Sequence, residues 1–315
     1  MSEYSDYLEK CMLCPRQCGI NRYESKGFCG AGSKIKLSRA ALHYMEEPCI
    51  SGTKGSGTIF FADCNMKCVF CQNHSISHDG FGKEVESGRF AEICLELQEK
   101  GANNINLVTP TMYVPIIVKE IKSIKDKLHI PVVYNTGGYE RRKTISLLEG
   151  VVDIYLTDIK YFDDEIAIKY SAAPDYYMYA KEALVEMINQ VGKPEYYNFN
   201  GQEMLLKKGV IVRHLVMPGN RKDSLKIVQW LGENINPEDY VISLMSQYTP
   251  GHGESIYPEL NRRITSFEYE SVVKEAIKYN IVNGYMQERN SAGKEYTPDF
   301  NLEGVDDSDN ELLHI

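Results

Sequence analysis

The sequence lacks the features that mark membrane and secreted proteins. Its 315 residues contain no run of about eighteen apolar residues, which a membrane-spanning helix requires. Residues 1–6 are polar and acidic and do not resemble a secretory signal. We therefore expect a cytoplasmic protein that has no contact with a membrane.

Positive charge is also scarce. The chain has 35 lysines and arginines against 44 aspartates and glutamates, so its formal net charge is −9. An acidic chain is poorly suited to bind a polyanion, and we do not expect nucleic acid among its partners. Internal repeats and low-complexity tracts are absent as well. A hydrophobic content of 43% then indicates a globular protein with a large core.

Cysteine is absent from most of the chain. All nine cysteines lie between Cys11 and Cys94. A disulfide framework is not expected in a reducing compartment, so metal ligation explains this crowding better. Cys94 is an exception, because Phe90, Ile93 and Leu97 flank it at helical spacing and predict that it packs on an apolar face.

Three cysteines follow the strand-like residues 58–61 with the spacing C-x3-C-x2-C. They are Cys64, Cys68 and Cys71. Three thiolates bind three irons of a cubane and leave the fourth iron open to a small molecule. A zinc site would need a fourth ligand such as His74 or His78, and a ferredoxin would run C-x2-C-x2-C. Structural zinc sites usually pair two close ligands with two distant ones, so we favour the open cluster.

With an aromatic residue, Phe70, before its last cysteine, this motif resembles the signature of the radical S-adenosylmethionine (SAM) superfamily. The flanking stretches 55–58 and 71–73 are similar to those of pyruvate formate-lyase activating enzyme and its relatives. The resemblance extends from about Cys11 to Gln287. It implies an oxidoreductase of anaerobic chemistry, with a [4Fe-4S] cluster whose open iron is chelated by SAM.

The same resemblance implies the reaction. One electron, from a reductant such as flavodoxin or ferredoxin, cleaves SAM to methionine and a 5′-deoxyadenosyl radical. The radical abstracts hydrogen from a substrate, and in activating enzymes this is a glycyl residue of a partner protein. Two alternatives remain open: a radical SAM enzyme that modifies a small molecule or peptide, and a non-catalytic zinc-binding interaction protein.

Beyond the cysteine motif, strand-like and helix-like stretches alternate, which is typical of a parallel sheet with crossover helices. Six strands are predicted, at residues 58–61, 105–109, 131–138, 151–160, 210–217 and 240–245, and 281–286 is a candidate edge strand. The predicted fold is α/β, a partial (β/α)6 radical SAM barrel over residues 51–287. A Cys-rich metal-binding segment, 1–50, precedes it. An acidic tail, 288–315, follows and is predicted to be solvated, unless 296–300 folds back over the barrel.

The amino-terminal segment contains a second group of cysteines, spaced C-x2-C-x3-C-x10-C. They are Cys11, Cys14, Cys18 and Cys29. Four thiolates suffice for a zinc ion in a closed tetrahedral site or for an auxiliary iron–sulfur cluster, and the spacing does not decide between these metals. Unligated or redox-paired cysteines are the third interpretation.

Polar residues at the carboxyl ends of barrel strands become neighbours at one mouth. Asp158 and Lys160 match the Asp-x-Lys element of the activating enzyme and project to one face of a strand end, although a surface ion pair would look the same. Thr109 and Thr111 lie where the superfamily usually has Gly-Gly-Glu, so they would meet the methionine amino group as neutral acceptors. Asn135 replaces an acid of the activating enzyme.

Strand alternation allows only one of Arg213 and His214 to reach the cofactor or substrate. The predicted SAM contacts are Phe70, Thr109, Thr111, Asn135, Asp158, Lys160 and His214, and no residue is assigned to acid–base catalysis. Gln247, Tyr248 and His252 are weaker candidates. The tyrosine-rich stretches 173–179 and 195–200 would either cover the substrate or pack loops.

Overall fold

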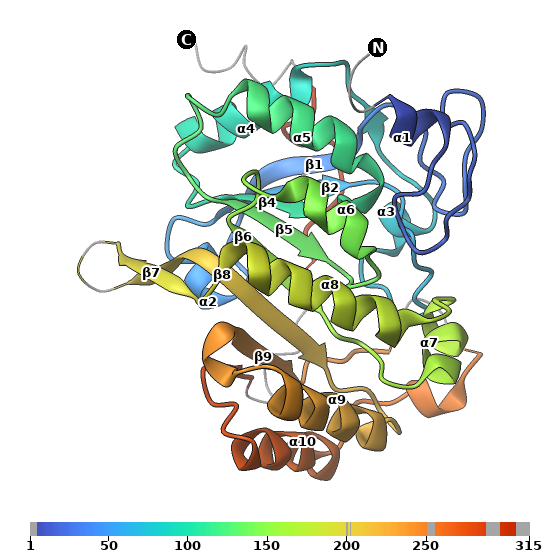
Figure 1. The fold of residues 1–315 in the computed structure, drawn as a ribbon, viewed down its shortest axis with the longest axis vertical. Coiled ribbons are helices and arrows are strands. Elements are labelled where there is room, and N and C mark those ends of the chain that lie inside the picture. The colour runs from blue at the N-terminus through green and yellow to red at the C-terminus, as the bar shows by residue number, and fades with distance from the viewer. Residues whose placement is uncertain (1–4, 200, 202, 251–255, 288–296, 307–315) are drawn as a thin grey trace.

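A computed structural model describes residues 5–199, 201, 203–250, 256–287 and 297–306 (Figure 1). Its strands are β1 (Lys36–His43), β2 (Ser56–Phe61), β3 (Lys83–Glu84), β4 (Ile105–Val108), β5 (Val132–Thr136), β6 (Ile154–Asp158), β7 (Glu195–Asn198), β8 (Met204–Leu215), β9 (Val241–Met245) and β10 (Gly284–Met286). They form one sheet in the order β10-β9-β8-β6-β5-β4-β2-β1-β3, and β7 pairs with β8.

From β2 to β10 all neighbours on this path are parallel. The six predicted strands are present, and the candidate edge strand is β10. Within the described residues the two ends of the sheet do not pair with each other, so the barrel is incomplete. The structure confirms the predicted partial barrel.

The longer helices connect the parallel strands and cover the outer face of the sheet (Figure 1). The helices are α1 (Asp6–Glu9), α2 (Pro48–Ser51), α3 (His74–Ser77), α4 (Arg89–Glu99), α5 (Val114–Ser123), α6 (Arg142–Ile145), α7 (Asp164–Ser171), α8 (Tyr176–Val191), α9 (Arg221–Asn234) and α10 (Ser266–Lys278), with 3-10 turns at Thr111–Tyr113, Ser146–Leu148, Pro237–Asp239 and Pro258–Leu260. Cys94 is buried on the apolar face of α4, as predicted.

The sequence did not predict β1, which pairs antiparallel with β2 and closes one side of the barrel. Its central residues, Ser38 to Ala41, contain no β-branched or aromatic side chain, so local propensity gives no strand signal. Ladder bonds with β2 and burial against the core determine its conformation. The short strands β3 and β7 were not predicted from the sequence either.

The amino-terminal end of the barrel is filled by α2. Cys49 and Ile50 of this helix pack against a buried cluster from the inner faces of the strands, including Val133, Leu156 and Ile211. Apolar packing of this kind fills this end of the barrel within the described residues.

Residues 297–306, from the predicted acidic tail, lie along β1. The backbone N–H of Ala40 donates to the carbonyl of Glu303 at 2.8 Å, and that of Leu302 donates to Ser38 at 3.0 Å. The ring of Phe300 packs on Phe60 with centroids 5.2 Å apart. This part of the segment folds back over the barrel, and the domain boundaries stay predictions.

Among the described helices, none is long and apolar enough to cross a membrane.

Candidate active site

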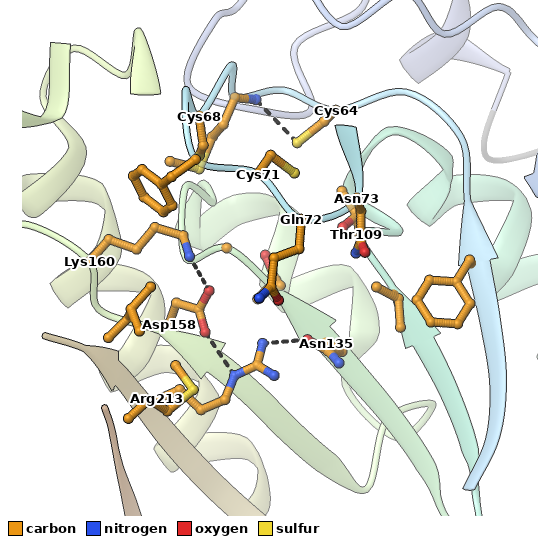
Figure 2. Close-up of a pocket in the computed structure, with 18 of the residues that line it drawn as sticks. Cys64, Cys68, Cys71, Gln72, Asn73, Thr109, Asn135, Asp158, Lys160 and Arg213 are labelled. Atoms are coloured by element: carbon orange, nitrogen blue, oxygen red, sulfur yellow. Dashed lines mark hydrogen bonds and ion pairs between the residues drawn. The ribbon is translucent and has the colours of Figure 1, made fainter. Parts of the chain in front are cut away.

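A cavity of about 260 Å³ opens at the carboxyl ends of the parallel strands. Side chains from β2, β4, β5, β6 and β8 and from the loops that follow them line it (Figure 2). Two non-glycine residues beside it, Asp63 and Thr109, have positive φ angles of 74° and 60°. A β-branched residue such as Thr109 rarely adopts this conformation, and strain of this kind is concentrated at functional sites.

The three cysteines of the motif project from the loop after β2 onto one side of this cavity (Figure 2). Backbone bonds fix the loop, since Lys67 N–H donates to the carbonyl of Ser171 at 3.0 Å. Hydroxyl groups contact two of the sulfurs. Ser171 Oγ donates to Cys68 Sγ at 2.9 Å, and Ser77 Oγ lies 3.2 Å from Cys71 Sγ. Hydrogen bonds to sulfur are one means by which a protein sets a cluster's reduction potential.

Burial disfavours the thiolate form of these three cysteines, and a bound cation would stabilise it. Burial raises the pKa of Cys68 to about 11, although the Lys160 ammonium opposes this, and burial also raises the pKa values of Cys64 and Cys71. In the described part of the chain, no three Cys, His, Asp or Glu side chains converge closely enough to hold a single metal ion. A cubane needs no such convergence, because each thiolate binds a different iron. Three thiolates on one loop thus suit a cubane.

Across the cavity from the cysteines, Asp158 at the end of β6 joins two cations. Its carboxylate binds the Lys160 ammonium, and its Oδ1 accepts a hydrogen bond from Arg213 Nε at 2.8 Å (Figure 2). Burial opposes ionisation of Asp158, but these two cations outweigh it and lower the pKa of its carboxyl group. The Asp158 carboxylate thus holds the Lys160 ammonium and the Arg213 guanidinium in place through charge-assisted hydrogen bonds in a buried site.

Glu46 extends this network and was not predicted from the sequence. Its Oε1 accepts from Asn135 Nδ2 at 3.4 Å, and its Oε2 lies 3.7 Å from Arg213 Nη1. Arg213 Nη2 also donates to Asn135 Oδ1 at 2.7 Å. Burial raises the pKa of Glu46, although the Arg213 guanidinium opposes this shift. Glu46 precedes α2, so only the tertiary fold brings it to the strand ends.

The candidate contacts Phe70, Thr109, Thr111, Asn135, Asp158 and Lys160 all line the cavity, whereas His214 does not. Arg213 pairs with Asp158 in the parallel register and shares its face, so the next residue points to the opposite side. His214 Nδ1 there contacts the carbonyl of Ile159 at 2.7 Å, and burial lowers the pKa of its imidazole to about 4. Of these two residues near the end of β8, Arg213 and not the predicted His214 lines the cavity, and contact with SAM stays a prediction.

The weaker candidates have different outcomes. Gln247 and Tyr248 line the cavity, and the ring of Tyr248 lies 5.9 Å from that of Phe70. His252 lies outside the described residues. Residues 195–198 of the stretch 195–200 form β7 and do not cover the site, because β7 pairs with the first residues of β8, at the opposite end of the barrel.

The four amino-terminal cysteines lie together, away from the main cavity. Cys11, Cys14, Cys18 and Cys29 line a small hollow of their own. As they stand, they do not present three ligands to one ion within the described residues. A second metal there remains a prediction.

Arg16 ties the amino-terminal segment to the barrel. Its Nε donates to the carbonyl of Asn65, next to Cys64, at 3.1 Å, and its guanidinium lies 3.7 Å from the ring centroid of Phe28. The amino-terminal segment therefore packs directly on the cysteine loop.

Comparison with known proteins decides the family. The sequence model of the radical SAM superfamily matches residues 58–231, more than half of the chain. The chain belongs to the radical SAM superfamily. Membership confirms the resemblance and implies an enzyme with a [4Fe-4S] cluster and SAM. An uncharacterised protein of Methanocaldococcus jannaschii is 34% identical over 285 residues, which cover 87% of this chain and 76% of that protein.

Several solved structures are similar to this chain at low sequence identity. Streptococcus suis SuiB bound to its precursor peptide SuiA is 13% identical, with a TM-score of 0.48 over 71% of this chain and 46% of SuiB. A domain of pyruvate-formate lyase-activating enzyme from Bacteroides vulgatus is 12% identical, with a TM-score of 0.40 over 57% of this chain and 94% of the domain. HydG, the FeFe-hydrogenase maturase of Carboxydothermus hydrogenoformans, is 11% identical, with a TM-score of 0.46 over 69% of this chain and 49% of HydG. This chain thus spans about half the length of SuiB and HydG.

Proposed function

We propose that this protein reductively cleaves SAM and uses the resulting radical to abstract hydrogen from a substrate at the carboxyl end of the barrel. The observation that supports this most directly is the placement of Cys64, Cys68 and Cys71 on one wall of the cavity. In this proposal they hold the cluster, which when bound supplies the open iron and the electron for cleavage.

Other residues around the cavity would hold the rest of SAM. Lys160 retains hydrogens beyond its bond to Asp158, so its ammonium suits the methionine carboxylate. Asp158 keeps Lys160 and Arg213 in place. Phe70 offers an apolar face for the adenine, and the hydroxyl groups at the end of β4 suit the methionine amino group.

The charges at the inner end of the cavity bear on the substrate. Glu46 and Arg213 line this end, where Glu46 Oε2 lies 3.7 Å from Arg213 Nη1. A glycyl residue within a polypeptide carries no charge, whereas Glu46 suits a hydrogen-bond donor such as an amine or hydroxyl. This feature favours a polar small molecule or a polar peptide side chain over a glycyl residue of a partner protein.

The closed sides of the barrel support the same choice. β1 and residues 297–306 cover the side next to β2, and α2 fills the amino end, so a loop of a large partner would have to enter through the mouth. A glycyl-radical partner remains the second candidate because of the resemblance to the activating enzyme.

Fractionated cell extract distinguishes the two candidates. Holoprotein reconstituted without oxygen, with SAM and a reductant, is mixed with either the ultrafiltrate or the retained macromolecules, and 5′-deoxyadenosine is measured. We expect the ultrafiltrate to stimulate cleavage and E46Q to lose that stimulation. Stimulation by the macromolecules alone, with a glycyl-radical signal in electron paramagnetic resonance, would instead support an activase.

A further inference from the structure

Two buried hydroxyl groups connect the loop after β6 to one sulfur of the cysteine motif. They belong to Tyr161, the residue after Lys160, and to Ser171, the last residue of α7. The Tyr161 hydroxyl lies 2.6 Å from Ser171 Oγ, and Ser171 Oγ lies 2.9 Å from Cys68 Sγ. A row of two hydroxyls and a sulfur therefore runs from the core to the cavity wall that carries the cysteines.

The number of hydrogens fixes the direction of both bonds. A thiolate that binds iron has no hydrogen, so Ser171 must donate its single hydroxyl hydrogen to Cys68 Sγ. Ser171 Oγ then has only lone pairs to offer, so the Tyr161 hydroxyl must be the donor in the other bond. Both buried hydrogens thus have an acceptor, as buried polar groups in proteins generally do. The two hydroxyls act in sequence, since Tyr161 donates to Ser171 and Ser171 donates to the sulfur.

The backbone at the end of α7 holds Ser171 against this sulfur. The carbonyl of Ser171 accepts the N–H of Lys67 at 3.0 Å, and the carbonyl of Tyr170 accepts the N–H of Val69 at 2.9 Å. Both chain neighbours of Cys68 are therefore bonded to two successive residues of the helix. The contact between hydroxyl and sulfur is thus built on backbone segments that hydrogen bonds hold together on either side of it.

A donor beside a cluster sulfur acts on the reduction potential of the cluster. Reduction adds negative charge to the cluster and its thiolates, so an O–H group that points at a sulfur stabilises the reduced form more than the oxidised form. The bond from Tyr161 polarises the Ser171 hydroxyl and strengthens its bond to sulfur, by about 10–30% in condensed-phase estimates. Loss of either hydroxyl should therefore make the cluster harder to reduce.

We propose that Tyr161 and Ser171 form a hydrogen-bond relay that raises the reduction potential of the cluster bound at the cysteine motif. Tyr161 is a positioning residue, because it acts on the sulfur only through Ser171. This inference rests on the proposed function, since it takes an iron–sulfur cluster as the group that the cysteines bind. The loop after β6 then contributes to SAM cleavage twice, because it places Lys160 at the cavity and Tyr161 behind Cys68.

The test is the midpoint potential of the reconstituted holoprotein without SAM, from a redox titration followed by electron paramagnetic resonance. At a fixed potential, S171A should lower the ratio of reduced to oxidised cluster about tenfold, which is about 59 mV for a one-electron couple. Y161F should lower this ratio about twofold, or about 18 mV, because Ser171 still donates but its hydroxyl is less polarised. The double variant Y161F/S171A should have the same ratio as S171A, because Tyr161 then has no hydroxyl to act through.

Y139F is the matched control. Tyr139 is also buried, and its backbone carbonyl accepts a hydrogen bond from Asn65 Nδ2 of the cysteine loop at 2.7 Å. Its hydroxyl donates to the carbonyl of Pro174 at 2.8 Å, rather than to the serine that contacts the sulfur. Y139F thus removes a buried hydroxyl beside the same loop, and we expect it to keep the wild-type potential. A general effect of losing a buried tyrosine hydroxyl would instead appear in both Y139F and Y161F.

Several results would overturn the relay: a wild-type potential in S171A, a further shift when Y161F is added to S171A, or equal shifts in Y139F and Y161F. If S171A does not retain a cluster, the comparison of Y161F with Y139F decides. A lower potential in Y161F alone supports the relay, and equal potentials overturn it. A wild-type holoprotein without an iron–sulfur cluster would overturn the proposed function itself, whereas a protein that cleaves SAM but has the same potential in all variants would overturn only the relay.

Discussion

The hydroxyl of Tyr176 offers a sharp test of how the strand-end charges are positioned. Tyr176 is fully buried at the start of α8. Its hydroxyl donates toward the carbonyls of Gly137, at 2.8 Å, and Asp158, at 3.0 Å, and it accepts the backbone N–H of Lys160 at 2.9 Å. One oxygen thus joins the turn after β5 to the Asp158–Lys160 element. The turn is tight, because Gly138 has a φ of 81° and a Cβ there would clash with the Asp158 carbonyl.

Y176F removes this junction without changing the ring. The Lys160 N–H loses its acceptor in a buried site, which costs about 1–3 kcal/mol of unfolding free energy. For 315 residues the unfolding entropy is about 0.66 kcal/mol/K, so the apparent Tm should fall by about 2–5 °C. Formation of 5′-deoxyadenosine should fall by about tenfold or more, because Lys160 and Asp158 are no longer aimed at the cavity.

Y155F is the matched control. Tyr155 is a buried residue of β6 whose hydroxyl bonds to Gln190 Oε1 at 2.6 Å, on the helix side of the sheet. Y155F should lower the Tm by a similar amount and leave SAM cleavage by the folded protein unchanged. Wild-type cleavage by Y176F, or an equal loss in both variants, would refute the reasoning.

Three further predictions concern the cysteines, the fifth barrel strand and a buried acid. C68A should abolish SAM cleavage while C11A retains part of it, and equal loss in an assay of 5′-deoxyadenosine would contradict the proposed division between the two cysteine groups. R213L should lower SAM cleavage about tenfold because Asp158 loses one of its two cations, whereas H214Q should leave cleavage per folded molecule unchanged. Burial raises the pKa of Glu140 from its ordinary value to about 7, so the free energy of unfolding of the wild type falls as pH rises between these values. From pH 6 to pH 8 the free energy of unfolding of E140Q should therefore rise by about 1.4 kcal/mol relative to the wild type, which corresponds to about 2 °C in Tm. A difference in Tm that does not change with pH would contradict this prediction.

The features that the sequence predicts correctly are those with local patterns. Apolar runs ending in polar residues identify β5 and β6, and the capping box of Thr265 and Glu268 marks the start of α10. Both bonds of the box are present, together with a bond from Arg262 Nη2 to Glu268 Oε1 at 2.7 Å. Cysteine spacing identifies the loop after β2, because consecutive ligands must reach one cluster from a single loop.

The features that escape prediction depend on tertiary contacts. Glu46 lies far from the strand ends in sequence, and Glu140 reaches Thr111 only because β4 and β5 are parallel neighbours. At the end of β8, the alternation of side chains along the strand allows either Arg213 or His214 to face the cavity, but not both. Only the register with β6, in which Arg213 lies beside Asp158, decides between them. A rule that seeks a cation one strand away from an inward-facing acid would have selected Arg213.

The central claim is that Cys64, Cys68 and Cys71 leave one iron of a cubane open for SAM. The most direct measurement combines iron and sulfide analysis of protein reconstituted without oxygen with an assay of 5′-deoxyadenosine after reduction in the presence of SAM. We expect an iron–sulfur cluster whose electron paramagnetic resonance signal shifts when SAM binds, and cleavage that is lost when any one of the three cysteines is replaced by alanine. Zinc in place of iron at these residues, or a cluster signal that SAM does not change, would contradict the account.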